Sequence, residues 1–172
     1  RGINIAAGDD NVIVGNYIGT GVSGTTDLGN AWDGISIESG SSGNLIGGTT
    51  LSDRNVISGN NQVGVRIRDV GSDYNRISGN LIGTDLSGNL AVGNNLGGVA
   101  IHAGAQFNIV GTNADGADDS LEGNVISASG VYSGLDIFDP GTDHNRVAGN
   151  RIGTNISGTA ALGHNNSGVS LY

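Results

Sequence analysis

A six-residue motif that occurs three times constrains the fold of this chain more than any other feature. It stands as GNYIGT at 15–20, GNLIGT at 79–84 and GNRIGT at 149–154, so only its third residue varies. The segments that follow it also match one another, over residues 23–37, 87–101 and 157–171. Internal repeats of this length indicate a repeat architecture, in which each unit is stabilised by packing on its neighbours.

Each long repeat divides into short apolar segments. Segments of the form Gly-Φ-x-Φ, where Φ is an apolar residue, begin at Gly2, Gly34, Gly64, Gly98, Gly134 and Gly168. After each of the first five come two segments of the form Asn-x-Φ, which begin at Asn11 and Asn16, Asn44 and Asn55, Asn75 and Asn80, Asn108 and Asn124, and Asn145 and Asn150. Successive side chains of a strand face opposite sides, so the Φ positions form inward columns of mostly β-branched residues.

These columns predict an all-β fold, namely a single-stranded right-handed parallel β-helix with three short strands per coil and about five coils. Residues 1–172 form one domain of this kind. The chain begins inside a repeat and stops one strand into a new coil. We therefore expect a fragment or uncapped segment of a longer rod, or a subunit that stacks end to end with copies of itself.

The corners between strands are predicted from their glycine and asparagine residues. Glycine adopts positive φ without strain, and asparagine tolerates the left-handed region better than most residues. Stacked asparagine amides are also expected to hydrogen-bond from coil to coil. The varying residue of the motif, which is Tyr17, Leu81 or Arg151, is predicted to face water.

Three insertions follow the third strand of alternate coils, beginning at 20–24, 84–88 and 154–158. Each holds an apolar pair, and the pairs are Val22 and Leu28, Leu86 and Val92, and Ile156 and Leu162. We predict ordered arms, each with a small side core.

The repeats resemble those of a known group of proteins. GNxIGT and NVISGN coils, the latter at 55–60, are similar to the Asn/Gly-rich repeats of bacterial surface and secreted proteins with the right-handed parallel β-helix of the pectin-lyase-like superfamily. The resemblance covers the whole chain and implies an extracellular or cell-surface location. It further implies that polysaccharide, where bound, contacts the outer face of the first strands.

The charge balance narrows the range of partners. The formal net charge is −9, and all seven basic residues are arginine. Such a surface cannot displace phosphate counterions over a wide area, so we expect no nucleic-acid partner. No run of 18 apolar residues is present, so we expect no membrane insertion. The absence of cysteine excludes disulfides and thiolate metal sites.

The outer face of the first strands supplies the candidate ligand-binding residues. Arg66, Arg68, His102 and Phe138 lie there and would form a sugar-binding strip, with Phe138 for stacking. The alternative is a solvated face with pairs between neighbouring coils, such as Glu38 with Arg68. Glu38 and Asp136 are three coils, or about 14 Å, apart. That separation is too large for the carboxylate pair of a glycosidase.

Asp136, Asp143 and His144 are the candidate catalytic residues, because an Asp–His pair serves a lyase or uronate epimerase as acid and base. Asp143 also aligns with Asp9 and Asp73, which favours the alternative of turn residues that bond their own backbone.

An acidic loop is the candidate metal site. Its carboxylates are Asp115, Asp118, Asp119 and Glu122. They offer oxygen ligands for Ca²⁺, but the D-x-[DN]-x-[DN]-G pattern is absent, and a plain solvated loop is the alternative. We expect no other cofactor.

Together these features favour a non-catalytic extracellular or cell-surface structural or adhesive solenoid with weak carbohydrate binding on the first-strand face. One alternative is a carbohydrate-active module, that is, a polysaccharide lyase, hydrolase or uronate epimerase. Another is a phage tailspike-type shaft. An enzyme is expected to show coil-specific polar residues clustered on one face, and the clearest such break lies at 136–144.

Overall fold

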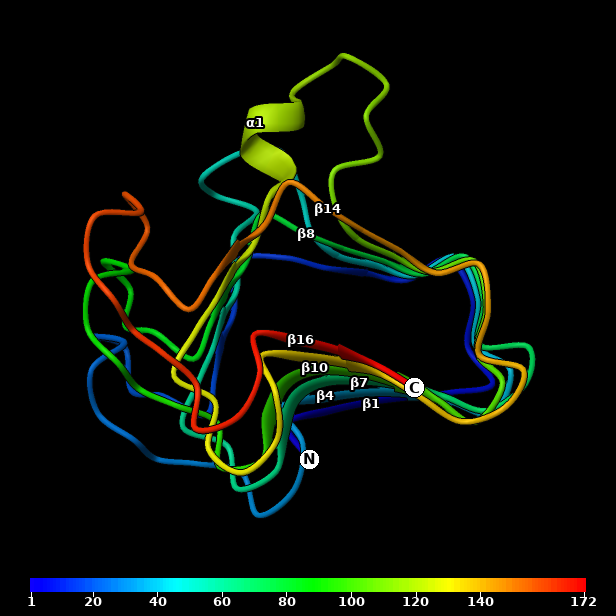
Figure 1. The fold of residues 1–172 in the computed structure, drawn as a ribbon, viewed down its shortest axis with the longest axis horizontal. Helices are drawn as coiled ribbons and strands as arrows, with labels where there is room; N and C mark the ends of the chain where they lie inside the picture. Colours follow the sequence, from blue (N-terminus) through cyan, green and yellow to red (C-terminus); the bar gives the residue numbers. More distant parts are fainter.

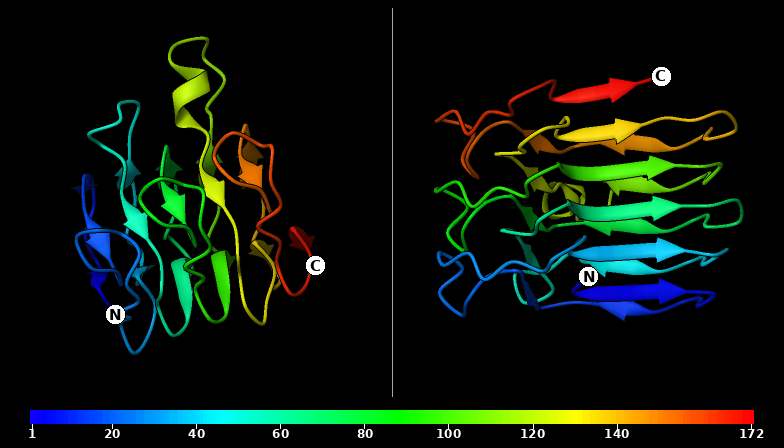
Figure 2. Two further views of the ribbon diagram at one scale, coloured as in Figure 1. Left: turned by 90° about the vertical axis from the view of Figure 1, so that its left-hand side faces the viewer. Right: turned by 90° about the horizontal axis from the view of Figure 1, so that it is seen from below.

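A computed structural model describes residues 1–172 as a parallel β-solenoid. The chain winds through about five coils, and each coil contributes one strand to each of three sheets. Seen along its axis the solenoid is three-sided, with arms on one side and a loop bearing the helix on another (Figure 1). Side views show the coils stacked in sequence order from the N-terminus to the C-terminus (Figure 2). The predicted all-β solenoid is therefore confirmed.

The three sheets collect strands from equivalent places in successive coils. The first sheet contains β1 (Ile3–Ala6), β4 (Ile35–Glu38), β7 (Val63–Arg68), β10 (Gly97–His102), β13 (Leu135–Ile137) and β16 (Val169–Leu171). The second contains β2 (Val12–Ile13), β5 (Leu45–Gly47), β8 (Arg76–Ser78), β11 (Ile109–Gly111) and β14 (Arg146–Ala148). The third contains β3 (Tyr17–Ile18), β6 (Val56–Ile57), β9 (Leu81–Ile82), β12 (Val125–Ile126) and β15 (Arg151–Ile152). The one helix, α1 (Asp119–Glu122), has four residues, and the structure contains no helix able to span a membrane.

The core consists of the predicted inward columns. In the third sheet Ile57, Ile82 and Ile126 are fully buried and lie in register on consecutive strands. In the second sheet Ile46 and Ile77 pair in the same way. Fully burying an aliphatic side chain of this size stabilises the fold by about 1.5–3 kcal/mol, so stacking the coils supplies the cohesion that one coil lacks.

Asparagine side chains form two continuous ladders, as predicted. One ladder runs through Asn11, Asn44, Asn75, Asn108 and Asn145, with amide-to-oxygen distances of 2.8–3.1 Å. The other runs through Asn16, Asn55, Asn80, Asn124 and Asn150, at 2.9–3.0 Å. Ladder amides also donate to backbone carbonyls; Asn80, for example, donates to Ile46 O at 2.9 Å.

A third ladder was not predicted from the sequence. It lies at the corner before the first sheet and runs from Asn30 to Asn60 to Asn94 at 2.8 and 2.9 Å. The next two coils place Ser129 and His164 at this position, where the Ser129 amide donates to Nδ1 of His164 at 3.2 Å. This ladder is therefore incomplete.

The corners confirm the prediction for glycine and correct it for asparagine. Gly15, Gly79 and Gly149 have φ values of 69°, 72° and 71°. No asparagine has positive φ, so asparagine stands at the corners because of its ladder bonds. The residue before the second-strand asparagine adopts the left-handed conformation instead, for example Tyr74 at 58° and Phe107 at 55°.

The three arms are ordered, as predicted, and form a stack of their own (Figure 2). Ile156 N–H, in the last arm, donates to Gly88 O in the middle arm at 2.8 Å. The stack covers part of the third sheet, so Val56, Leu81 and Val125 are buried beside Ile156. The prediction that the varying motif residue faces water is therefore wrong for Leu81, although Tyr17 and Arg151 are exposed. The predicted side core is wrong for Val22, Leu28 and Leu86, which are 90%, 68% and 46% exposed.

Candidate functional site

The outer face of the first sheet is the floor of a groove. Its floor residues, in register from coil to coil, are Asn4, Ser36, Arg66, Ala100, Asp136 and Ser170. One wall is the turn that precedes each strand, where Trp32, Gln62, Leu96 and Tyr132 follow one another through backbone hydrogen bonds. The other wall is the end of the strands, with Glu38, Arg68, His102, Phe138 and Tyr172.

These walls bury part of the floor. Ser36, Ala100 and Asp136 are 0%, 4% and 5% exposed, whereas Asn4 is exposed. The interpretation of this face as solvated is therefore wrong for the three buried residues and correct for Asn4. The pairing expected with that interpretation is confirmed, because Arg68 Nη2 lies 2.6 Å from Glu38 Oε2.

A hollow of about 440 Å³ lies in the groove over Ala100. Its lining residues are Gln62, Val63, Arg66, Leu96, Ala100, Tyr132, Asp136, Phe138 and Tyr172. Ala100 pairs with Arg66 on one side and with Asp136 on the other. Its small side chain therefore leaves a gap between a guanidinium and a carboxylate.

Arg66 is held in place by several partners. Its Nε and Nη2 donate to Asp33 Oδ1 at 3.1 and 3.0 Å, and Asp33 is 2% exposed. Nη2 also donates to Gln62 Oε1 at 3.4 Å, and Nη1 lies 3.4 Å from His102 Nε2. The charge of Arg66 is thus matched by a buried carboxylate, while its orientation toward the hollow is fixed.

Asp136 lies across the hollow from Arg66. Its Oδ2 accepts the Ser133 amide at 3.1 Å. No arginine or histidine forms an ion pair with it. The hydroxyls of Ser133 and Ser170 lie beside it, 2.8 Å from each other. The floor therefore holds one carboxylate without a counter-charge.

The wall at the strand ends contains two residues with shifted pKa values, Glu38 and His102. Burial raises the pKa of Glu38, but the hydrogen bond and charge of Arg68, together with the charge of Arg1 and the Ser36 hydrogen bond, hold the pKa below its usual value. Burial lowers the pKa of His102, and the charge of Arg66 lowers it further. The Asp139 carboxylate, 3.5 Å from His102 Nδ1, opposes this shift. His102 is therefore favoured in its neutral form.

The rings of this wall stack on one another. The centroids of His102 and Phe138 are 4.7 Å apart, and those of Phe138 and Tyr172 are 5.9 Å apart. Because both faces of Phe138 are covered, only its edge is available to a ligand. Tyr132, on the opposite wall, is 49% exposed and stacks on no other ring.

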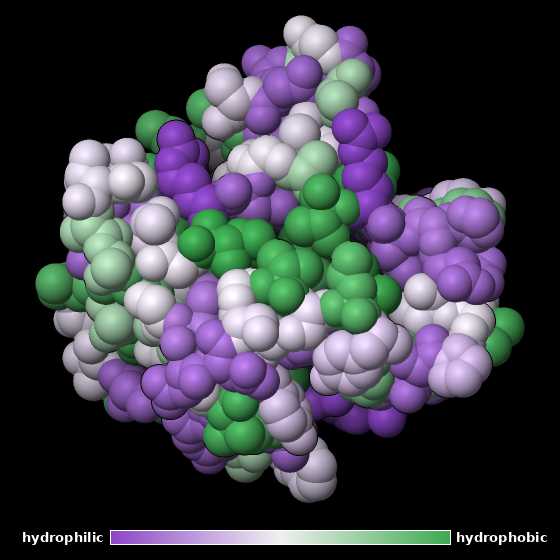
Figure 3. All heavy atoms as spheres, viewed as in Figure 1, coloured by the Kyte–Doolittle hydropathy of each residue, from purple (hydrophilic) through white to green (hydrophobic).

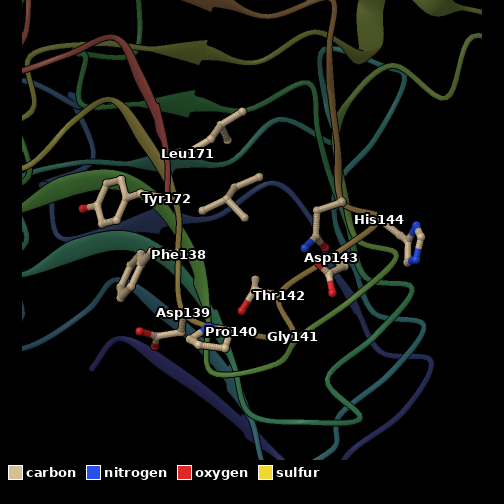
Figure 4. Close-up of a pocket in the computed structure, with 11 residues that line it drawn as sticks. Phe138, Asp139, Pro140, Gly141, Thr142, Asp143, His144, Leu171 and Tyr172 are labelled. Atoms are coloured by element: carbon tan, nitrogen blue, oxygen red, sulfur yellow. The ribbon is translucent and has the colours of Figure 1, made fainter.

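The structure separates the three candidate catalytic residues. Asp136 faces the groove, whereas Asp143 and His144 line a different hollow of about 690 Å³ along the turn at 138–145. His144 points away from Phe138 and Tyr172 in this hollow (Figure 4). Its ring stacks on Phe107 at 5.0 Å, in a second column that begins with Tyr74.

The aligned aspartates of that turn bond to the neighbouring coil. Asp9 Oδ1 accepts the Ser42 amide at 2.8 Å, and Asp73 Oδ1 accepts the Gln106 amide at 2.7 Å. The expectation that they bond their own backbone is therefore wrong: Asp9 and Asp73 join one coil to the next, and the Asp143 side chain forms no hydrogen bond within the chain.

The carboxylates of the acidic loop are engaged mainly within it. Asp115 accepts from Asn113 Nδ2 at 2.8 Å, and Asp119 accepts from Thr112 Oγ1 at 2.5 Å. Glu122 is buried and forms an ion pair with Arg76 of β8. Asp118 has positive φ and caps no helix amide with its side chain. No three of the His, Asp and Glu side chains converge as a metal-binding group.

The sequence predicted the floor of the groove and the wall at the strand ends, but not the wall formed by the preceding turns. Arg66 and Phe138 line the hollow as predicted for a strip, and Arg68 and His102 lie beside it. Gln62, Leu96 and Tyr132 were missed. Each stands two residues before the glycine of a Gly-Φ-x-Φ segment. The large side chains at this repeated position could have predicted the wall.

The end of the solenoid that the last coil forms carries an exposed apolar surface. Apolar side chains gather at the centre of this end (Figure 3). Val169 and Leu171 contribute to it and are 40% and 70% exposed. End-to-end stacking stays a prediction.

Comparison with protein-family models, with curated proteins and with solved structures finds no match to this chain.

Proposed function

We propose that this chain is an extracellular or cell-surface β-solenoid, structural or adhesive in role, that binds carbohydrate without chemical conversion in the groove of the first sheet. The hollow over Ala100 carries the proposal. It combines apolar surface from Leu96 and Tyr132 with planar polar groups from Arg66 and Asp136. Saccharides have apolar C–H faces and hydroxyl edges, and such a mixture of lining groups suits them.

The carboxylates of the groove favour binding over hydrolysis. Asp136 is the one carboxylate that lines the hollow. Glycoside hydrolysis ordinarily uses two carboxyl groups about 5–9.5 Å apart that flank the scissile bond. Asp143 and His144 line the other hollow, so they do not supply the second group.

We also propose membership of the pectin-lyase-like superfamily. The three parallel sheets, the asparagine ladders and the GNxIGT coils support it. In this proposal the chain keeps the outer-face binding position of that group.

A glycan array followed by calorimetry with a positive oligosaccharide tests the function. Tyr132→Ala is expected to weaken binding about tenfold or more, because it removes half-exposed aromatic surface from the wall. Tyr74→Ala is the matched control, since Tyr74 is 65% exposed and lies outside the groove. An array without any bound glycan, or equal losses in the two variants, would refute the proposal. Product formation from a bound oligosaccharide would favour the enzyme alternative.

A further inference from the structure

The charges of the groove point to a more specific ligand. Resting on the proposed function, we infer that the groove selects a saccharide with a protonated amine, such as a glucosamine oligomer, over a uronate. The inference depends on which charges in the hollow already have partners.

Arg66 does not offer a free positive charge. Its Nε and Nη2 bind one oxygen of Asp33, which is buried beneath it. Arg68 and Arg1 share the single carboxylate of Glu38, at 2.6 and 3.0 Å, and neither lines the hollow. A sugar carboxylate entering the hollow would therefore compete with Asp33 for Arg66.

Asp136 offers a free negative charge. The residue is 5% exposed and lines the hollow. Its Oδ2 accepts the Ser133 amide, and Oδ1 accepts no hydrogen bond within the chain. A buried carboxylate without a counter-ion is costly, and a charge-assisted hydrogen bond from an ammonium group offsets that cost.

The surroundings of Asp136 fit a sugar that carries such a group. Leu96 and Tyr132 offer apolar surface on the turn wall, while Arg66 lies beyond Ala100 on the floor. An amine at Asp136 would leave the ring over Ala100 and the sugar hydroxyls near Gln62 and Arg66. A uronate at the same place would set like charges together.

Calorimetry with three oligomers of equal length tests this inference on the whole chain. The ligands are a glucosamine oligomer, its N-acetylated form and a galacturonate oligomer. The unaltered chain is expected to bind the free amine about tenfold or more tightly than the N-acetylated form. Asp136→Asn is expected to remove that preference.

Asp143→Asn is the matched control, because it removes the same charge from an exposed carboxylate that lies on the turn at 138–145 and does not line the groove hollow. It is expected to leave the preference unchanged. Loss of the preference in both variants would show attraction to the net charge alone and overturn the inference.

Two further outcomes separate this inference from the proposed function. If the N-acetylated oligomer or the galacturonate oligomer binds as tightly as the free amine, the inference fails and carbohydrate binding stands. If no oligomer and no array glycan binds, both fail. The comparison of ligands uses the unaltered chain, so it decides the question even where Asp136→Asn does not fold.

Discussion

At the corner before the third strands, asparagine occupies the same position in all five coils, from Asn16 to Asn150. On the outer face of the first sheet the aligned residues differ from coil to coil, and Ser36, Arg66, Ala100 and Asp136 are neighbours. A ladder position bonds to a copy of itself, so substitution in one coil disrupts the coils on both sides. A floor position has no such requirement, so each coil can place a different group there. Repetition in this chain therefore marks what holds the coils together, and variation marks where a binding surface can form.

The largest expected effect is that of breaking a complete ladder at its centre. Asn80 is 1% exposed, donates to Asn124 Oδ1 and Ile46 O, and accepts from Asn55. Asn80→Ala is expected to lower the free energy of unfolding by about 3 kcal/mol or more, because buried partners are left without hydrogen bonds. Urea unfolding monitored by circular dichroism measures the loss.

Asn166→Ala serves as the control for this ladder. Asn166 is exposed, and its expected effect lies within about 0.5 kcal/mol. Equal losses in the two variants would contradict the assigned role of the ladder.

A smaller effect is expected where the arms cover the third sheet. Leu81 is fully buried, whereas Tyr17, at the same position of the first coil, is 42% exposed. Leu81→Ala is expected to cost about 2–4 kcal/mol of unfolding free energy, and Tyr17→Ala less than about 1 kcal/mol. Thermal melts of both variants compare them. Similar shifts in melting temperature would show that the arms do not pack on the sheet.

The incomplete third ladder predicts a change of stability with pH. Nδ1 of His164 accepts the Ser129 amide, and a protonated ring cannot accept there. Burial lowers the pKa of His164 below its usual 6.5, against the opposing effects of the Ile126 backbone and Asp136. The unfolded chain therefore binds the proton first, so the unfolding free energy is intact above pH 6.5 and decreases as the pH falls below it.

The His164→Asn variant isolates this contribution. His102 shifts in the same direction, so the variant is expected to reduce the pH dependence without abolishing it. Urea unfolding at a series of pH values measures both chains. Identical pH profiles would contradict the assigned role of His164.

Most of the scaffold could be predicted from the sequence, because each structural position is repeated. The inward isoleucines and the two complete ladders follow from a fixed spacing. The third ladder did not follow from the spacing, because Ser129 and His164 replace asparagine at this position in the last two coils. Burial of Leu81 depends on the stacked arms, with Gly88 of its own coil and Ile156 of another close by, and the pattern around the motif does not encode that stacking.

The candidate site could be predicted only in part. The spacing placed Arg66, Asp136 and Phe138 on one face. It did not show that Asp33 neutralises Arg66, or that Phe138 is stacked between two rings. These features depend on side-chain directions at turns of varying length, and short-range periodicity does not determine them.

An NMR titration of the chain with a saccharide identified on the array tests whether the varied positions of the groove contact the ligand. Amide shifts are expected to change at the varied positions around the groove, namely 62, 66, 96, 100, 132 and 136, while the amides of Asn44, Asn80 and Asn108 remain unchanged. Shifts concentrated along the asparagine ladders or at residues 139–145 would contradict binding in the groove.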